Sequence, residues 1–161
     1  MKEGNRAKSI AFLVFGAPCS GKTTFSEHFA KRFQAPFYNL TELKAAYNLS
    51  RKMLMMVVEQ VAKTGTTLVF EGEIGTEAER TEIRNILRRA GYDPILVWIQ
   101  TDVSTIKSRM KQRTKSPAKA KEMYENGVRE LEAPNDLEAP IVLSGKHTFE
   151  TQLRHVLSQL R

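Results

Sequence analysis

The chain has 161 residues, of which 41% are hydrophobic and 27% are charged, and its formal net charge is +7. This length and composition are typical of one globular domain that buries a core without disulfide bonds. The single cysteine, Cys19, excludes an internal disulfide framework, and no apolar segment is long enough to cross a membrane, so we expect a soluble cytoplasmic protein. We expect a single domain over residues 1–161, with a disordered N-terminus at 1–8.

Residues 9–15 (SIAFLVF) form a continuous apolar run that predicts a buried parallel strand. The loop sequence that follows is Gly16, Ala17, Pro18, Cys19, Ser20, Gly21, Lys22, Thr23 and Thr24. After it, Phe25, Phe29 and Phe33 recur on one face of a predicted helix. A strand, a G-x-x-x-x-G-K-T loop and a helix in this order are the context of a phosphate-binding loop.

The chemistry of such a loop gives its residues specific roles. Its backbone N–H groups and the positive end of the following helix face a polyphosphate. Lys22 can reach the β- and γ-phosphates of a nucleoside triphosphate, and the Thr23 hydroxyl can bind Mg²⁺. The alternative, a chance turn before a helix, leaves the matching strand and helix on either side unexplained.

Strands and helices alternate along the rest of the chain. Further strands are predicted at 36–40, 67–70, 94–100 and 140–143. Further helices are predicted at 41–47, 51–63, from 76 to about 90, from 102 into the basic segment, at 117–132 and at 149–160, with N-caps at Thr41, Ser50, Asp102 and Thr148. This alternation predicts an α/β fold with a parallel sheet, whose ligand-binding loops share the edge at the carboxyl ends of the strands.

Carboxylates that follow predicted strands are the candidate catalytic and metal-side acids. Glu71 directly follows the third strand and is the candidate for holding a metal, and Glu73 either shares that role or faces an acceptor. Glu42 follows the second strand and is the candidate general base that takes the proton from an acceptor hydroxyl. The alternatives are solvated loop acids for Glu71 and Glu73, and for Glu42 a first-turn acid stabilised by the helix dipole.

All of the excess positive charge lies between Lys107 and Lys121, a segment with seven basic residues and no acidic one. Arg109 and Arg113 are four residues apart, so they lie on one helix face and can act as catalytic arginines on β- and γ-phosphates. We therefore expect residues 107–138 to form a basic lid region. A basic stripe of this kind can also bind nucleic acid non-specifically.

Arg80 has two interpretations. It lies in the helix after the Glu71 loop, where it can hold a phosphate of an acceptor. Because Arg84 and Arg88 follow at the same four-residue spacing, a salt-bridged surface row is the alternative.

With these residues in place, the chain resembles the small P-loop kinases of the nucleoside-monophosphate-kinase-like group. The closest resemblance is to the AAA-domain predicted kinase family, which is related to polynucleotide kinase, gluconate and shikimate kinases and zeta toxins. The resemblance rests on the loop at 16–24, on Glu71, on the Arg109 and Arg113 pair and on the stretch at 131–134 (LEAP). It implies a three-layer α/β/α fold with sheet order 2-3-1-4-5, ATP and Mg²⁺ as cofactors, and transfer of the γ-phosphate to an acceptor.

Two positions depart from the pattern of that family. Relatives often carry an aspartate after the second strand, where this chain has Thr41. Relatives also favour an aspartate after the third strand, where this chain has Glu71, which is one methylene longer. Both changes bear on the acceptor and the turnover rate and leave ATP binding intact.

Three functions follow from these observations. The first is an ATP-dependent kinase for a small-molecule or nucleotide acceptor, including a sugar nucleotide as in zeta toxins. The second is a non-catalytic or weakly hydrolytic ATP-binding module. The third is a polynucleotide 5′-end kinase, or a module that binds nucleic acid through the basic lid region. The oligomeric state is left open.

Overall fold

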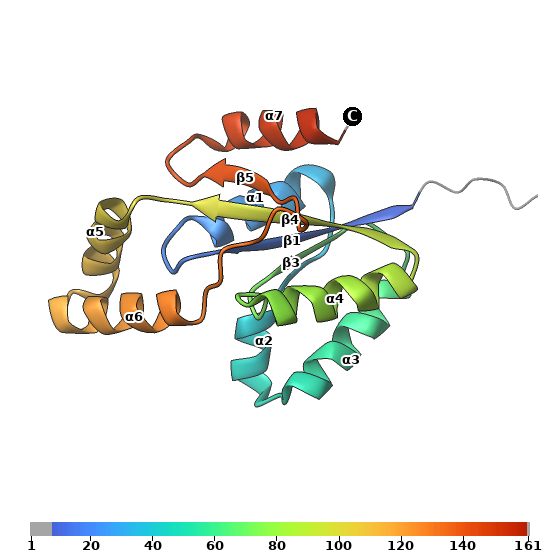
Figure 1. The fold of residues 1–161 in the computed structure, drawn as a ribbon, viewed down its shortest axis with the longest axis horizontal. Coiled ribbons are helices and arrows are strands. Elements are labelled where there is room, and N and C mark those ends of the chain that lie inside the picture. The colour runs from blue at the N-terminus through green and yellow to red at the C-terminus, as the bar shows by residue number, and fades with distance from the viewer. Residues whose placement is uncertain (1–7, 161) are drawn as a thin grey trace, which may run out of the picture.

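The computed structural model describes residues 8–160, and its fold is an α/β sandwich (Figure 1). Of the expected disordered N-terminus at 1–8, residues 1–7 lie outside the described residues, and Lys8 is exposed and precedes the first strand. The elements in chain order are β1 (Ser9–Gly16), α1 (Lys22–Phe33), β2 (Phe37–Asn39), α2 (Leu40–Tyr47), α3 (Arg51–Ala62), β3 (Leu68–Glu71), α4 (Glu77–Arg89), β4 (Tyr92–Gln100), α5 (Val103–Thr114), α6 (Pro117–Arg129), β5 (Ile141–Ser144) and α7 (Phe149–Gln159).

The five strands form one parallel sheet in the order β2-β3-β1-β4-β5. This is the order that the family resemblance implies, and it is confirmed. In the register of the sheet, Val14 of β1 lies beside Glu71 of β3 and Val97 of β4. The loop after β1 and the acid that ends β3 therefore emerge at the same edge of the sheet.

Helices cover both faces of the sheet, which gives the three layers of the fold (Figure 1). Helices α1 and α7 pack on one face, where Phe12 and Phe29 are both almost fully buried and their rings meet edge to face at 4.6 Å. Helices α3 and α4 pack on the other face, around Leu13 and Phe70. Helices α5 and α6 lie beyond the carboxyl ends of the strands, where they flank the phosphate-binding loop (Figure 1).

Most helices begin where the sequence predicts, because their N-cap side chains bond the first turn. Ser50 accepts a hydrogen bond from the backbone of Met53, and Asp102 and Thr148 cap α5 and α7 in the same way. Helix α2 is an exception: Asn39 is its N-cap, so the expectation of Thr41 as the cap is wrong by two residues. Among residues 8–160, no helix has the length and apolarity needed to cross a bilayer.

Candidate functional site

The loop between β1 and α1 shapes the centre of the site. Gly21 is the N-cap of α1 and has a φ of 102°, in the left-handed region that glycine adopts without strain. Helix α1 begins at Lys22, directly after this turn, so its first N–H groups and the positive end of its dipole face the mouth of the loop. This geometry is that of an anion site built from backbone.

Lys22 lies inside the curve of its own loop. Its Nζ donates a 3.3 Å hydrogen bond to the backbone oxygen of Ala17. Burial lowers the pKa of Lys22, and the nearby Glu71 carboxylate partly offsets that effect. Because burial destabilises the charge on this ammonium group, a polyphosphate in the loop would add negative charge that stabilises it.

Thr23 and Glu71 meet at the start of α1. The Thr23 hydroxyl donates a 2.6 Å hydrogen bond to Oε1 of Glu71. Glu71 is only 3% exposed, and no described residue bonds its Oε2. Burial raises the pKa of Glu71, while the Thr23 hydrogen bond and the charge of Lys22 act in the opposite direction.

These two oxygen donors fit Mg²⁺. This ion prefers hard oxygen ligands, keeps several waters, and is usually held by one or two protein groups together with substrate phosphates. The unpaired Oε2 of Glu71 is a buried acceptor that such a hydrated ion would satisfy. Residues 8–160 contain no cluster of three or more His, Cys, Asp or Glu side chains that could bind a metal without phosphates.

We expect Glu71→Gln to raise the melting temperature of the ligand-free protein at pH 7. Because burial raises the pKa of Glu71 above its ordinary 4.5, the folded state holds this proton more tightly than the unfolded state does. The wild-type protein therefore loses stability as the pH rises from about 4.5 through the raised pKa, and a neutral glutamine avoids that loss. Thermal unfolding across this range tests the prediction. A difference between the two proteins that does not grow with pH would contradict it.

A first cavity of about 530 Å³ opens over the phosphate-binding loop. It is lined by Cys19, Gly21, Lys22, Thr23, Thr24, Phe25, Glu27, His28, Arg109, Arg113, Gly145, His147, Phe149 and Gln152. Arg109 donates to the backbone oxygens of Cys19 (3.2 Å) and Gly145 (3.0 Å), so it joins the loop to the end of β5. Arg113 also lines this cavity, and its side chain is exposed. The two arginines thus line one cavity, and their role as catalytic arginines stays a prediction.

Sequence reasoning missed the contribution of the segment after β5. Gly145, His147 and Phe149 all line the first cavity. Gly145 packs so closely on the loop that a Cβ built there would lie 1.9 Å from the backbone oxygen of Ser20. The available signal was the position of Gly145 two residues after the strand predicted at 140–143, because ligands bind where parallel strands end.

A second cavity, of about 580 Å³, lies on the other side of Lys22. It is lined by Phe15, Gly16, Pro18, Lys22, Thr41, Lys44, Gly72, Glu73, Ile74, Gly75, Thr76, Glu79, Gly127, Arg129, Glu130 and Leu131. In its wall, Lys44 Nζ pairs with Glu73 Oε2 at 2.7 Å. The sequence pointed to Glu73 here, but it did not indicate Lys44 or Arg129.

The structure does not bring Glu42 into the second cavity. Its side chain is exposed and lines a separate shallow hollow with Asn39 and Leu43. Thr41, its neighbour, lines the second cavity instead. Glu42 therefore stays a prediction as general base, whereas Glu73 lines the second cavity together with Glu79 and Glu130.

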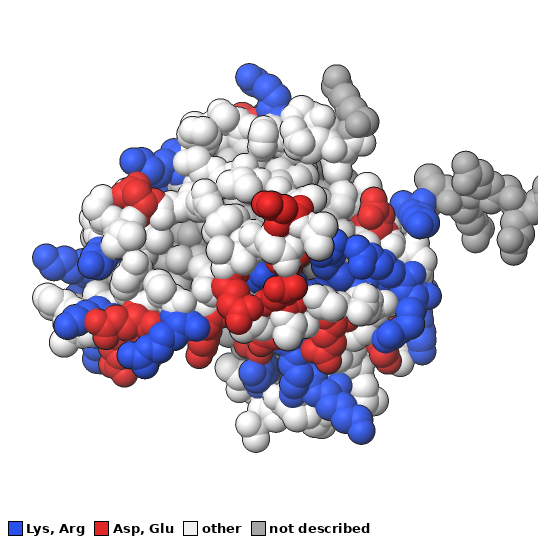
Figure 2. All heavy atoms as spheres, in the orientation of Figure 1, with Lys and Arg blue, Asp and Glu red and all other residues white. Residues whose placement is uncertain are grey.

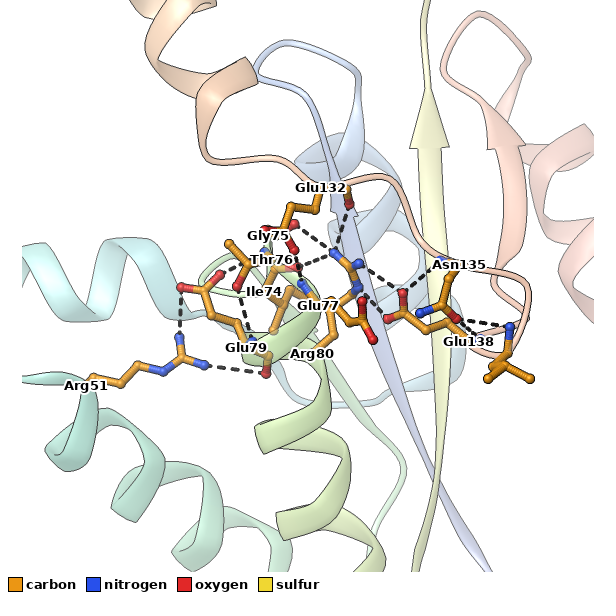
Figure 3. A network of polar contacts seen from close by, with 11 residues as sticks. Arg51, Ile74, Gly75, Thr76, Glu77, Glu79, Arg80, Glu132, Asn135 and Glu138 are labelled. Atoms are coloured by element: carbon orange, nitrogen blue, oxygen red, sulfur yellow. Dashed lines mark hydrogen bonds and ion pairs between the residues drawn. The ribbon is translucent and has the colours of Figure 1, made fainter.

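Both interpretations of Arg80 are wrong. Its side chain is fully buried, and its Nε lies 2.6 Å from Oε1 of Glu138 in an ion pair (Figure 3). It therefore belongs to no surface row, and it lines neither cavity. Glu138 lies in the segment between α6 and β5, which the sequence assigned to the lid region without a role.

A parallel sheet in the order β2-β3-β1-β4-β5, with a phosphate-binding loop after β1, defines a P-loop kinase fold of the nucleoside-monophosphate-kinase-like group. A family model described as an AAA domain matches residues 12–133. The chain belongs to this AAA domain family.

Solved structures with low sequence identity share the fold over nearly the whole chain. A gluconokinase from Sinorhizobium meliloti 1021 has a TM-score of 0.73 at 17% identity and covers 96% of this chain and 93% of its own. The Mycobacterium tuberculosis APS kinase CysC in complex with AMPPNP and APS has a TM-score of 0.70 at 16% identity, with 95% and 98% covered. Chaetomium thermophilum Kti12 in complex with ADP-AlF3 has a TM-score of 0.69 at 17% identity, with 93% and 96% covered. No curated protein matches the sequence.

Proposed function

We propose that the protein is an ATP-dependent kinase that transfers the γ-phosphate to a small-molecule or nucleotide acceptor. The observation that carries this proposal is the position of Lys22, which lines both cavities. The first cavity has the backbone anion site and two arginines, which suit a triphosphate. The second has comparable volume and polar walls, which suit an acceptor. Similar folds that bind AMPPNP or ADP-AlF3 support the assignment of the first cavity.

In this mechanism the protein positions the reacting groups and neutralises the charge on the phosphates, and it forms no covalent bond to the substrates. The loop at 16–24 orients the β- and γ-phosphates. Lys22 contacts the transferred γ-phosphate from the side that faces the acceptor. Arg113 is the exposed arginine of the first cavity and supplies positive charge to the phosphate oxygens, while Arg109 fixes the loop against Gly145. Thr23 and Glu71 would hold Mg²⁺, which neutralises charge that develops on the phosphates.

The acceptor hydroxyl needs a proton acceptor, and we expect Glu73→Gln to slow phosphoryl transfer more than Glu42→Gln does. A positioned general base is worth about 10²–10⁴-fold in rate, and Glu73 lines the second cavity whereas Glu42 does not. Initial rates under saturating ATP separate the two variants, with ATP affinity as the control for an intact first cavity. A larger loss in Glu42→Gln would assign the base to Glu42, as the sequence predicts.

ATP consumption against a panel of acceptors tests the proposed function. The panel contains nucleosides, sugars and sugar nucleotides, antibiotics and 5′-hydroxyl oligonucleotides. We expect at least one acceptor to stimulate consumption well above the rate with ATP and Mg²⁺ alone. Stimulation by none of them, with ATP still bound, would reject the kinase in favour of the second candidate function.

That second candidate is a non-catalytic or weakly hydrolytic ATP-binding module. Two observations favour it: Thr41 stands where related kinases carry an aspartate, and Glu73 is already paired with Lys44. The polynucleotide alternative has weaker support. Figure 2 shows acidic side chains among the basic ones at the lid end of this face, and Lys121 lies 3.8 Å from Glu125 within α6. Oligonucleotides in the panel decide this alternative directly.

A further inference from the structure

Arg80 binds two segments that border the second cavity. We call residues 72–76, between β3 and α4, the acceptor loop, and residues 130–138, between α6 and β5, the lid root. From α4, Arg80 donates through Nη1 to the backbone oxygens of Gly75 (2.7 Å) and Glu132 (3.1 Å), one in each segment (Figure 3). Its Nε and Nη2 donate to the two carboxylate oxygens of Glu138, at 2.6 and 3.0 Å.

The same guanidinium also lies against the phosphate-binding side of the site. Its central carbon is 4.8 Å from the centre of the Phe15 ring, and Phe15 directly precedes Gly16 of the loop. Arg80 is fully buried, so water does not compete for its hydrogen bonds. One side chain therefore joins the acceptor loop, the lid root and the end of β1.

The lid root also bonds the same Gly75 oxygen that accepts from Arg80. The N–H of Glu132 donates to this oxygen at 2.9 Å, and the carboxylate of Glu132 accepts from the N–H of Glu77, the first residue of α4, at 2.7 Å. A Cβ on Gly75 would lie 2.2 Å from the oxygen of Glu130, so this approach requires glycine.

Helix α6, which leads into the lid root, also touches the phosphate-binding loop. A Cβ on Gly127 would lie 2.0 Å from Cγ of Pro18, so the helix backbone rests directly on the loop. A displacement of Pro18 on nucleotide binding would therefore pass through α6 to the lid root. From the lid root it would reach the acceptor loop through Arg80.

We infer that Arg80 is a positioning residue that couples occupancy of the first cavity to the order of the acceptor loop and the lid root. This inference rests on the proposed function, in which ATP fills the first cavity and the acceptor fills the second. Arg80 lines neither cavity, so it acts only through the two segments that it holds. Binding of ATP then prepares the acceptor site before an acceptor arrives.

The test compares hydrogen exchange with and without ATP and Mg²⁺ in the wild-type protein and in Arg80→Met/Glu138→Leu. The double variant removes both buried charges together, which keeps the core free of an unpaired ion. Arg88→Met, at an exposed position of the same helix, is the matched control. In the wild type and the control we expect ATP to slow exchange in residues 72–76 and 130–138 by about fivefold or more. This factor is the lower end of the coupling that is typical between two linked binding sites.

In the double variant we expect ATP to protect the phosphate-binding loop with an affinity within about threefold of wild type, while the fivefold protection of the two segments is lost. If Arg80 only stabilised the fold, the double variant would not lose the protection of residues 72–76 and 130–138 while keeping its affinity for ATP. If the double variant fails to fold, Arg80→Lys serves in its place. Lysine keeps the positive charge beside Glu138 but lacks the planar guanidinium that also reaches the backbone oxygens of Gly75 and Glu132.

Protection of both segments in the variant at the wild-type level would overturn the inference, and so would its absence in the wild type with ATP bound. These outcomes are distinct from failure of the proposed function. If the wild type binds ATP but phosphorylates no acceptor, the kinase proposal fails and the protection data still decide the role of Arg80. If the wild type binds no ATP, both proposals fail.

Discussion

Lys22→Ala will abolish the rise in melting temperature that ATP and Mg²⁺ give the wild-type protein, and will lower phosphoryl transfer by at least about 10²–10³-fold. The ammonium group of Lys22 is the positive side chain inside the curve of the loop, and it faces both cavities. Its loss leaves the backbone N–H groups to hold the phosphates without the charge that bridges donor and acceptor. Thermal unfolding at increasing ATP concentration measures the first effect, and product formation measures the second.

The matched control for this prediction is Lys31→Ala. Lys31 lies in the last turn of the same helix, is exposed, and lines neither cavity. Its replacement removes the same charge from α1 and should leave the ATP-dependent shift unchanged. An undiminished shift in Lys22→Ala would reject the assignment of the nucleotide to the loop at 16–24.

Glu138→Ala will destabilise the protein by about 3–5 kcal/mol, the cost typical of leaving one partner of a buried ion pair unpaired. Arg80, its partner, is fully buried and lies 2.6 Å away, so no solvent replaces the lost carboxylate. Urea denaturation measures the loss as a lower midpoint. The surface pair of Arg51 and Glu82 provides the control, because Glu82 is 46% exposed and Glu82→Ala should cost at most about 1 kcal/mol.

The pH dependence of this effect has a defined sign. Hydrogen bonding to Arg80 lowers the pKa of Glu138 below its ordinary 4.5. The stabilisation is therefore fully present above about pH 4.5 and is lost as the pH falls through the lowered pKa. The difference between wild type and Glu138→Ala should shrink in that range. A difference that is unchanged there, or a cost at pH 7 as small as that of Glu82→Ala, would show that the pair does not stabilise the fold.

The sheet and the phosphate-binding loop could be predicted because their signals are local. The apolar run at 9–15, the loop at 16–24 and the helix after it carry their own periodicity and turn chemistry. Helix caps such as Ser50 and Asp102 are equally local. Because the loops at the carboxyl ends of parallel strands share one edge of the sheet, Glu71 was expected near Thr23. The 2.6 Å hydrogen bond between them agrees with this expectation.

The side of the site around α2 could not be read in the same way, because it depends on where one short helix begins. With Asn39 as the cap, α2 begins at Leu40. In this phase Thr41 faces the second cavity and Glu42 faces solvent. A shift of one residue on a helix turns a side chain by about 100°, more than sequence patterns fix for a short helix.

Arg80 shows a different limit. It precedes the buried Ile83 and Leu87 by three and seven residues, so it falls on the apolar face of α4, and this spacing was the available signal. Its partner Glu138 is 58 residues away in a segment without regular structure. No local pattern pairs two such residues, and only the packing of the lid root against α4 brings them together.

The central claim is that the γ-phosphate of ATP in the first cavity is transferred, beside Lys22, to an acceptor in the second cavity. Phosphorus NMR of the wild-type protein with ATP, Mg²⁺ and the acceptor panel tests it most directly, because it identifies the product as well as the loss of ATP. We predict ADP together with a new phosphoester signal that is absent with Lys22→Ala. ADP with inorganic phosphate alone, whichever acceptor is present, would contradict the claim.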